Sequence, residues 1–170
     1  MNAIDFVNAI SIIASNYVSA NNDFAKIIID DLTICKKNTN VNVPSNNALI
    51  DLIFNYDISK LRILTISFNQ EEEIKEDEKY IYVGWAEAFP FAISKETGEI
   101  VELDWEDPNY IISYMAKNQN SFLDVLCEIE KLNQRELLEN ITHKDRKEII
   151  DKIQEIAGGT KYSWFRYLFE

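Results

Sequence analysis

Apolar residues in the first third of the chain recur at helical spacing. Over residues 3–18 they fall at three- and four-residue steps, which predicts an amphipathic helix. Residues 24–34 favour a second helix that the polar residues 21–23 can cap, although three consecutive isoleucines also suit a strand. A polar loop over residues 36–42 follows, and the Pro-Ser-Asn sequence at 44–46 predicts the start of a short third helix.

Strand patterns replace helical ones from Leu61 onward. Residues 62–68 alternate and are rich in β-branched and aromatic side chains, which predicts a strand. A charged connection over residues 70–79 follows, and further strands are predicted at 80–86, 89–94, 99–105 and 110–116. Gly98 suits the left-handed conformation that closes a hairpin between residues 94 and 99.

Helical spacing returns in the last third of the chain. Asn120 or Ser121 can cap a helix whose apolar residues share one face up to Leu132. Residues 142–145 begin another helix, which the Gly-Gly pair at 158–159 ends. Five aromatic residues then follow that are too apolar to remain in water, so we expect this tail to dock on the protein: Tyr162, Trp164, Phe165, Tyr167 and Phe169.

Together these elements predict an α+β protein with a mainly antiparallel central sheet of about five or six strands, flanked by N-terminal and C-terminal helices. A length of 170 residues with 46% apolar content suits a single domain over residues 1–170. Cys35 and Cys127 each lie in apolar sequence, so we expect two reduced core thiols rather than a disulfide.

The start of the chain has no secretion-signal pattern. No basic region opens it, and polar residues interrupt the early apolar ones. The longest apolar runs, such as residues 80–86, are far shorter than the roughly 20 residues that span a bilayer. We therefore expect a soluble, cytoplasmic protein that does not bind membranes.

Negative charge is concentrated in one segment. Residues 71–107 hold 13 of the 29 acidic residues and only three lysines, a charge of −10, whereas the rest of the chain adds −2 to reach the net charge of −12. A concentrated negative field attracts cations or basic proteins and repels nucleic acid. We therefore expect a basic protein partner and no direct contact with nucleic acid.

Three acids of this segment form a regular series. Glu102, Asp104 and Glu106 lie two residues apart in a predicted strand, which places them on one sheet face about 7 Å from each other. Such a row is open to three interpretations: a solvated face, a protein-contact surface, or a catalytic or hard-cation site with further ligands from elsewhere. No signature motif supports chemistry, so the first two interpretations are favoured.

The acidic connection has two similar interpretations, a hydrated link or a binding arm with Ile74 as an apolar anchor. Its carboxylates are Glu71, Glu72, Glu73, Glu76, Asp77 and Glu78. Trp85 and Trp105 are expected in the core, with an exposed interface anchor as the alternative for one of them.

Motifs for catalysis are absent from the sequence. It contains no nucleophile elbow, phosphate-binding glycine loop or zinc pattern. His143 is the only histidine, which argues against a histidine-rich metal site and favours an ordinary surface residue. We expect no enzyme activity, no metal and no cofactor, the alternative being an enzyme that acts through Glu102, Asp104 and Glu106.

Four stretches in the second half of the chain share their order and spacing with a known family. Phe-Pro-Phe-Ala-Ile at 89–93 and Thr-Gly-Glu-Ile-Val at 97–101 look like its strand, tight turn and strand. Residues 110–116 and Ser-Phe-Leu at 121–123 look like its final strand and the start of its next helix. In these motifs the chain resembles the SUKH superfamily, which includes many bacterial immunity proteins that neutralise polymorphic toxins.

This resemblance implies an α+β fold and inhibition by binding rather than by catalysis. The chain departs from the family pattern at residues 55–61, which lack the glycine-rich turn that many members carry. Toxin nucleases bind polyanions and tend to be basic, so an acidic surface suits their occlusion.

The functional hypothesis is an immunity protein of a toxin–antitoxin pair that binds a basic, nuclease-type toxin. A regulatory protein-binding adaptor with the same fold is the alternative. The predicted partner-binding residues are Glu71, Glu72, Glu73, Glu76, Asp77, Glu78, Glu102, Asp104, Trp105 and Glu106.

Overall fold

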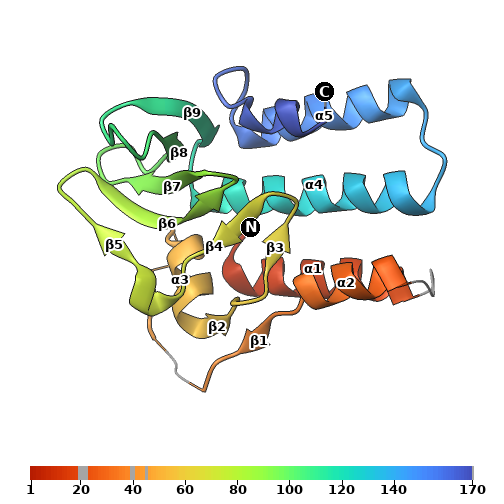
Figure 1. Ribbon diagram of the computed structural model, residues 1–170, viewed down its shortest axis with the longest axis horizontal. Helices are drawn as coiled ribbons and strands as arrows, with labels where there is room; N and C mark the ends of the chain where they lie inside the picture. The colour runs from red at the N-terminus through yellow and green to blue at the C-terminus, as the bar shows by residue number, and fades with distance from the viewer. Residues whose placement is uncertain (19–22, 39–40, 45, 170) are drawn as a thin grey trace.

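Helices stack beside one antiparallel sheet in the computed structural model, which describes residues 1–18, 23–38, 41–44 and 46–169 (Figure 1). Within these residues the α-helices are α1 (Ala3–Tyr17), α2 (Asp23–Asp31), α3 (Ala48–Asn55), α4 (Gln119–Leu138) and α5 (His143–Ala157). Two 3-10 helices are η2 (Glu71–Glu73) and η3 (Trp164–Leu168).

The main sheet has the strand order β3-β4-β6-β7-β8-β9, with β5 paired to β6, and every pairing is antiparallel. Its strands are β3 (Arg62–Ile63), β4 (Ile66–Phe68), β5 (Lys75–Glu76), β6 (Tyr80–Ala86), β7 (Phe89–Ser94), β8 (Ile100–Leu103) and β9 (Ile111–Ala116). A separate pair joins β1 (Cys35–Lys36) to β2 (Tyr56–Asp57). The predicted α+β architecture with a mainly antiparallel sheet is confirmed.

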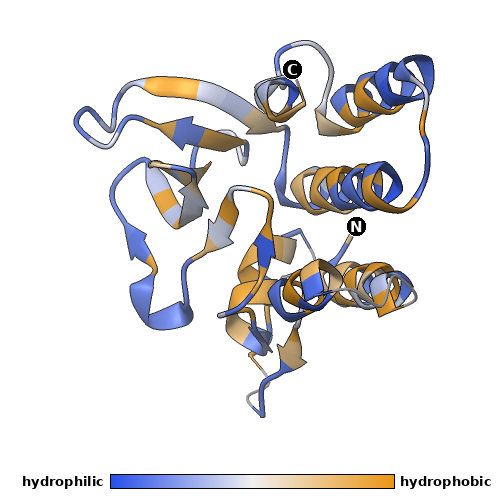
Figure 2. Ribbon diagram, turned by 45° about the vertical axis from the view of Figure 1, so that its right-hand side comes forward, coloured by the Kyte–Doolittle hydropathy of each residue, from blue (hydrophilic) through white to orange (hydrophobic). Residues whose placement is uncertain are grey.

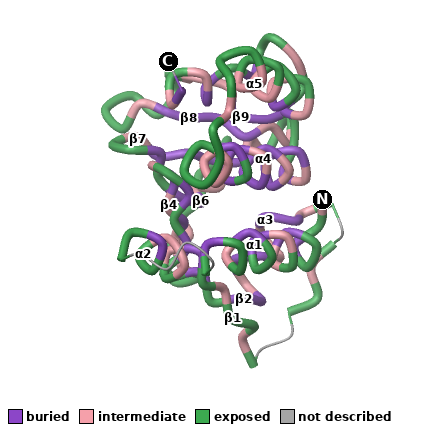
Figure 3. Tube along the Cα trace, turned by 90° about the vertical axis from the view of Figure 1, so that its right-hand side faces the viewer, coloured by how far each residue is buried: buried purple, intermediate pink, exposed green. Residues whose placement is uncertain are grey.

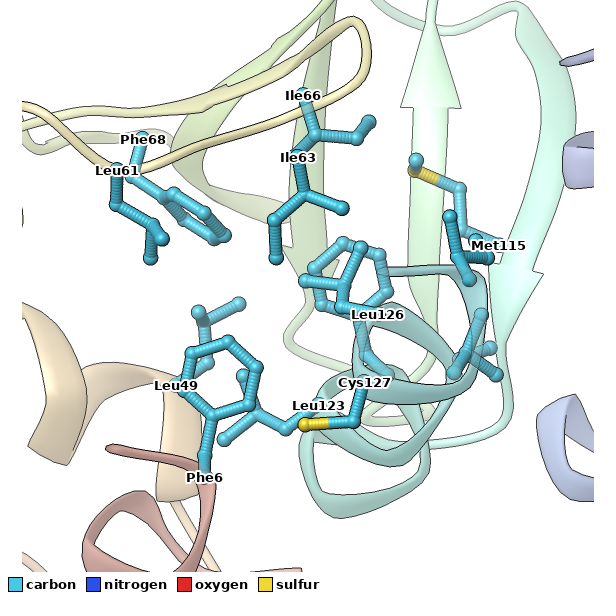
Figure 4. Packing of buried hydrophobic residues seen from close by; sticks show 14 of the residues in the cluster. Phe6, Leu49, Leu61, Ile63, Ile66, Phe68, Met115, Leu123, Leu126 and Cys127 are labelled. Atoms are coloured by element: carbon cyan, nitrogen blue, oxygen red, sulfur yellow. The ribbon is translucent and has the colours of Figure 1, made fainter. Parts of the chain in front are cut away.

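The core lies where α4 packs between the sheet and the other helices. α4 lies between α5 and α1, and the long helices carry mixed apolar and polar faces (Figures 1 and 2). Phe122 of α4 and Phe91 of β7 are fully buried, with ring centroids 5.3 Å apart. Phe6 of α1 and Leu49 of α3 reach the same cluster near Leu123 of α4 (Figure 4). Burial is concentrated along α4 and β8, as Figure 3 shows.

The ends of the helices differ from the predicted ends for local reasons. α2 is a helix, as favoured, and its predicted caps Asn21 and Asn22 lie outside the described residues, as does Ser45 before α3. α4 begins earlier than predicted because Asn118 caps it, accepting a hydrogen bond from the Ser121 N–H at 2.8 Å.

The single strand predicted over residues 62–68 is wrong, because this segment forms a hairpin of β3 and β4. Leu64 adopts a positive φ of 53°, which reverses the chain and pairs Ile63 with Ile66. Both isoleucines are buried, so the alternating pattern reports burial on each arm rather than one continuous strand.

The prediction of two core thiols is half right. Both cysteines are free and Cys127 is buried, but Cys35 is exposed because β1 pairs only with the two-residue strand β2.

The aromatic tail docks as predicted. Trp164 is buried and its indole N–H donates a 2.9 Å hydrogen bond to the Met115 carbonyl of β9. Phe165 is fully buried as well, whereas Tyr167 remains 46% exposed. The predicted hairpin turn is also present, with Gly98 at φ 74° and its N–H donating to the Ser94 carbonyl.

A buried carboxyl links α1 to α4. Glu130 of α4 is 2% exposed and accepts a 2.9 Å hydrogen bond from the Tyr17 hydroxyl of α1. Burial raises the pKa of Glu130 to about 7, and Asp31 of α2 adds to the rise, while the bonds from Tyr17 and Asn133 oppose it. A group with a raised pKa in the folded state binds more protons there than in the unfolded chain.

Gly84 allows β6 to pass close to its neighbours. A Cβ at this position would lie 2.3 Å from the Ser67 carbonyl oxygen and 2.5 Å from the Phe91 ring. The pairing of β6 with β7 shifts register between Tyr82 and Gly84, so a bulge and a glycine together seat Phe91 in the core.

The Glu130 carboxyl predicts a stability that falls as pH rises. Between pH 4.5 and about 7 the folded state holds the Glu130 proton and the unfolded chain does not, so the free energy of unfolding declines over this window. Relative to wild type, Glu130→Gln should be more stable at pH 8, by about 1–3 kcal/mol, and no more stable at pH 4.5. Urea denaturation at the two pH values measures this difference.

Glu128→Gln, two residues earlier in α4, is the matched control. Burial alone would raise the pKa of Glu128, but its bonds with Lys131 and Lys152 lower it overall. Its loss should therefore cost stability above pH 4.5 and cost less below. Equal pH dependence of the wild type and Glu130→Gln would contradict a buried, neutral carboxyl.

The contact at Gly84 predicts a large cost for one methyl group. Gly84→Ala should lower the free energy of unfolding by about 2–4 kcal/mol, because backbone and ring must both move. Gly98→Ala meets no atom within 4 Å and should cost only about 1 kcal/mol, from its positive φ. Urea denaturation of both variants checks that Gly84→Ala loses more stability than Gly98→Ala. Equal losses would refute the role of Gly84 in the packing of Phe91.

Candidate partner-binding surface

A pocket of about 680 Å³ opens on the face of the sheet that is turned away from α4. The small buried cluster on this face, Tyr80, Ala92, Val101 and Leu103, comes from strands alone. Residues of β5, β6, β7, η2, the connection after β4 and the loop after β8 line the pocket: Asn69, Glu72, Glu73, Lys75, Tyr82, Gly84, Trp85, Pro90, Asp104, Trp105 and Pro108. We call it the Trp85–Trp105 pocket.

Strand alternation turns Trp85 into this pocket. Gly84 pairs with Phe91, which is buried on the face toward α4, whereas Trp85 pairs with Pro90 one position away. Neighbouring residues of a strand point to opposite faces, so Trp85 and Pro90 share the outer one. Trp85 is 44% exposed.

A tight loop after β8 presents Trp105. The Asp104 carboxylate accepts a 2.8 Å hydrogen bond from the Glu106 N–H, and the Asp104 N–H donates to the Tyr110 carbonyl. These bonds close the loop and leave Trp105 63% exposed. The expectation that Trp85 and Trp105 lie in the core is therefore wrong: both indoles reach solvent at one pocket.

The acidic connection forms the opposite wall. Gln70 and Glu73 form a capping box around η2, in which the Glu73 carboxylate accepts the Gln70 N–H at 2.8 Å. β5 then pairs with β6, with Lys75 opposite Tyr82. The connection is exposed, as expected, but it carries regular structure, and Ile74 packs on the core as an anchor.

Three of the other acids of this connection are held by partners within the chain. Glu71 pairs with Lys37 at 3.4 Å and Glu76 with Lys95 at 2.8 Å. Asp77 accepts bonds from the Tyr82 hydroxyl and from two backbone N–H groups, which outweigh its desolvation and lower its pKa. Glu78 is exposed and lines no part of the pocket.

The predicted row of Glu102, Asp104 and Glu106 is wrong, because β8 ends at Leu103. Glu102 lies on the face toward α4, is 4% exposed and accepts a 2.7 Å hydrogen bond from Ser113. Burial raises the pKa of Glu102, and Glu87 adds to the rise. Asp104 and Glu106 belong to the following loop, where Glu106 is exposed.

Four of the predicted partner-binding residues thus line one pocket, namely Glu72, Glu73, Asp104 and Trp105. The prediction did not include Trp85, Pro90 or Pro108, which complete the apolar surface. A signal for Trp85 exists in the sequence, since it alternates with the small residues Gly84 and Ala86 in a strand. His143 is exposed at the start of α5 and lines a different pocket beside the α4–α5 connection.

The described residues contain no cluster of three or more histidine, cysteine or acidic side chains arranged to hold a metal ion. None of their helices is long and apolar enough to cross a membrane. No family model, curated protein or solved structure matches this chain.

The exposure of Trp105 predicts that its loss costs little stability. Trp105→Ala should change the free energy of unfolding by about 0.5 kcal/mol or less, because a solvent-facing side chain leaves no cavity. Trp164→Ala should cost about 3–5 kcal/mol, because that indole is buried and hydrogen-bonded. Guanidinium denaturation measures the free energy of unfolding of both variants. A loss above about 2 kcal/mol for Trp105→Ala would show that this side chain is packed in the core.

Proposed function

We propose that this chain is a non-catalytic binding protein of the immunity type, which neutralises a basic, nuclease-type toxin by covering its functional surface. The observation that carries the proposal is the Trp85–Trp105 pocket, where two exposed indoles lie among three carboxylates. Tryptophan is enriched at the energetically dominant positions of protein interfaces.

The distribution of charge supports a basic partner. The segment of charge −10 runs from Glu71 to Asp107 and contains most of the residues that line the pocket. Complementary charge accelerates the encounter of two proteins, and desolvated aromatic contacts slow their dissociation. A surface that combines both suits a partner that must be bound fast and held.

Binding rather than chemistry is supported by what the nearby acids do. The Asp104 carboxylate closes its own loop, and that of Glu73 caps η2. Glu102, the most buried acid of the segment, faces the opposite side of the sheet and contacts Ser113. Two of these carboxylates thus hold backbone N–H groups, and the third lies on the other face of the sheet, so none is a free acid or base beside a second one.

The order of elements also supports the immunity role, because it is the order that the SUKH resemblance implies: a hairpin of β7 and β8, a last strand β9 and the capped helix α4. A regulatory adaptor would use the same surface for a cellular protein whose activity survives binding. Neutralisation of the bound protein separates these two roles.

Affinity capture from the source cells, with the captured basic protein then assayed for nuclease activity and toxicity, tests the proposal. We expect the wild-type chain to abolish that activity at equimolar ratio. The Glu72→Gln, Glu73→Gln, Asp104→Asn variant should weaken binding by about tenfold or more and flatten its salt dependence. Surface plasmon resonance at low and high salt gives both rate constants.

A second triple variant controls for net charge. Glu78→Gln, Glu96→Gln and Glu106→Gln remove three exposed carboxylates of the same segment that do not line the pocket. This variant should slow association but leave dissociation unchanged. Capture of a protein that keeps its activity in the complex would refute neutralisation, and equal dissociation rates for both variants would refute the pocket as its site.

A further inference from the structure

The Trp85–Trp105 pocket combines the two features that bind a cationic side chain. Its apolar wall offers the exposed rings of Trp85 and Trp105, and its rim carries the carboxylates of Glu72, Glu73 and Asp104. The face of an indole attracts a cation electrostatically, more strongly than the face of a phenyl or phenol ring. Nearby carboxylates add direct charge complementarity.

The same sheet face already shows this chemistry within the chain. The Lys161 ammonium lies 3.9 Å from the centre of the Tyr114 ring and pairs with the Glu99 carboxylate. Tyr114 packs on the strand cluster of that outer face. At this end of the sheet the chain supplies the cation, the ring and the carboxylate together.

At the Trp85–Trp105 pocket the chain supplies the aromatic rings, and its acidic residues outnumber its basic ones. Lys75 is the single basic residue among those that line it, against three acids. In the part of the chain that the structure describes, Lys75 is exposed and forms no ion pair. The pocket therefore keeps negative charge beside its two indoles.

We infer that this pocket binds an arginine side chain in an extended basic segment of the partner, with the guanidinium against an indole and its N–H groups toward the rim carboxylates. Arginine suits the site better than lysine, because its planar guanidinium stacks on rings and is more weakly hydrated. A volume of about 680 Å³ exceeds one side chain and admits its neighbours along the segment. The inference rests on the proposed function only in taking the occupant from a basic protein.

A blocked tripeptide, acetyl-Gly-Arg-Gly-amide, is the probe, followed by the three indole N–H resonances in proton–nitrogen NMR spectra. The indole signals of Trp85 and Trp105 should shift on titration, whereas that of buried Trp164 should stay in place as an internal reference. The citrulline peptide, which keeps the shape but lacks the charge, should bind at least about tenfold more weakly. The lysine peptide should fall between them.

Single substitutions assign the contacts. Trp105→Ala should weaken binding of the arginine peptide about five- to thirtyfold. Tyr110→Ala is the matched control, because Tyr110 is 61% exposed, ends the same loop and does not line the pocket. Lys75→Met should strengthen binding about two- to fivefold by removing the competing charge.

Equal binding of the arginine and citrulline peptides would overturn the inference, as would unmoved Trp85 and Trp105 signals or a Trp105→Ala variant that binds as the wild type does. These failures differ from failure of the proposed function. If the pocket binds arginine but no toxin is neutralised, the arginine site stands and the immunity role is refuted. If a toxin is neutralised and binds Trp105→Ala as tightly as the wild type, the immunity role stands and the arginine site is refuted.

Discussion

The contact between Phe91 of β7 and Phe122 of α4 decides which face of the sheet is covered. Their ring centroids lie 5.3 Å apart and both side chains are fully buried. Gly84 has no Cβ, which leaves room for the Phe91 ring. Because strand residues alternate between faces, fixing Phe91 inward fixes Pro90 and its cross-strand partner Trp85 outward. The helical layer therefore buries one side of the sheet and leaves aromatic surface on the other.

Part of the concentrated negative charge lies beside this uncovered face of the sheet. η2 and β5 line one part of the pocket with acidic residues, and the loop from Asp104, which carries Trp105, lines another. An exposed tryptophan contributes little to folding, and under the proposed function its place among carboxylates serves contact with a partner. The neighbouring Lys161, Tyr114 and Glu99 show how such groups hold a cation when one is present.

Sequence periodicity was enough for the helices, the hairpin at Gly98 and the docked tail, since each depends on a local pattern of apolar residues or a single turn residue. It failed where the same pattern has two structural meanings. Residues 62–68 bury alternate side chains as two arms of a hairpin, and Leu64 gives no local signal of its positive φ. The acids at 102, 104 and 106 are two residues apart, but β8 ends at Leu103, so only Glu102 lies in the strand. Glu102 is therefore buried, whereas Glu106 lies in the exposed loop. Trp85 lies outside the core because α4 covers the other face of the sheet, whereas Trp105 lies outside it because β8 ends at Leu103, before the loop that presents Trp105.

Backbone hydrogen exchange, with and without a saturating arginine-rich peptide, shows whether a basic segment binds at the Trp85–Trp105 pocket, because it reports which part of the surface becomes covered. We expect slower exchange in β5, in β6 near Trp85 and in the loop from Asp104 to Tyr110, with α1 and α2 unchanged. α1 and α2 carry their own exposed apolar residues, including Ile12, Phe24 and Ile27. Protection confined to α1 and α2, with none around Trp85 and Trp105, would contradict binding at this pocket.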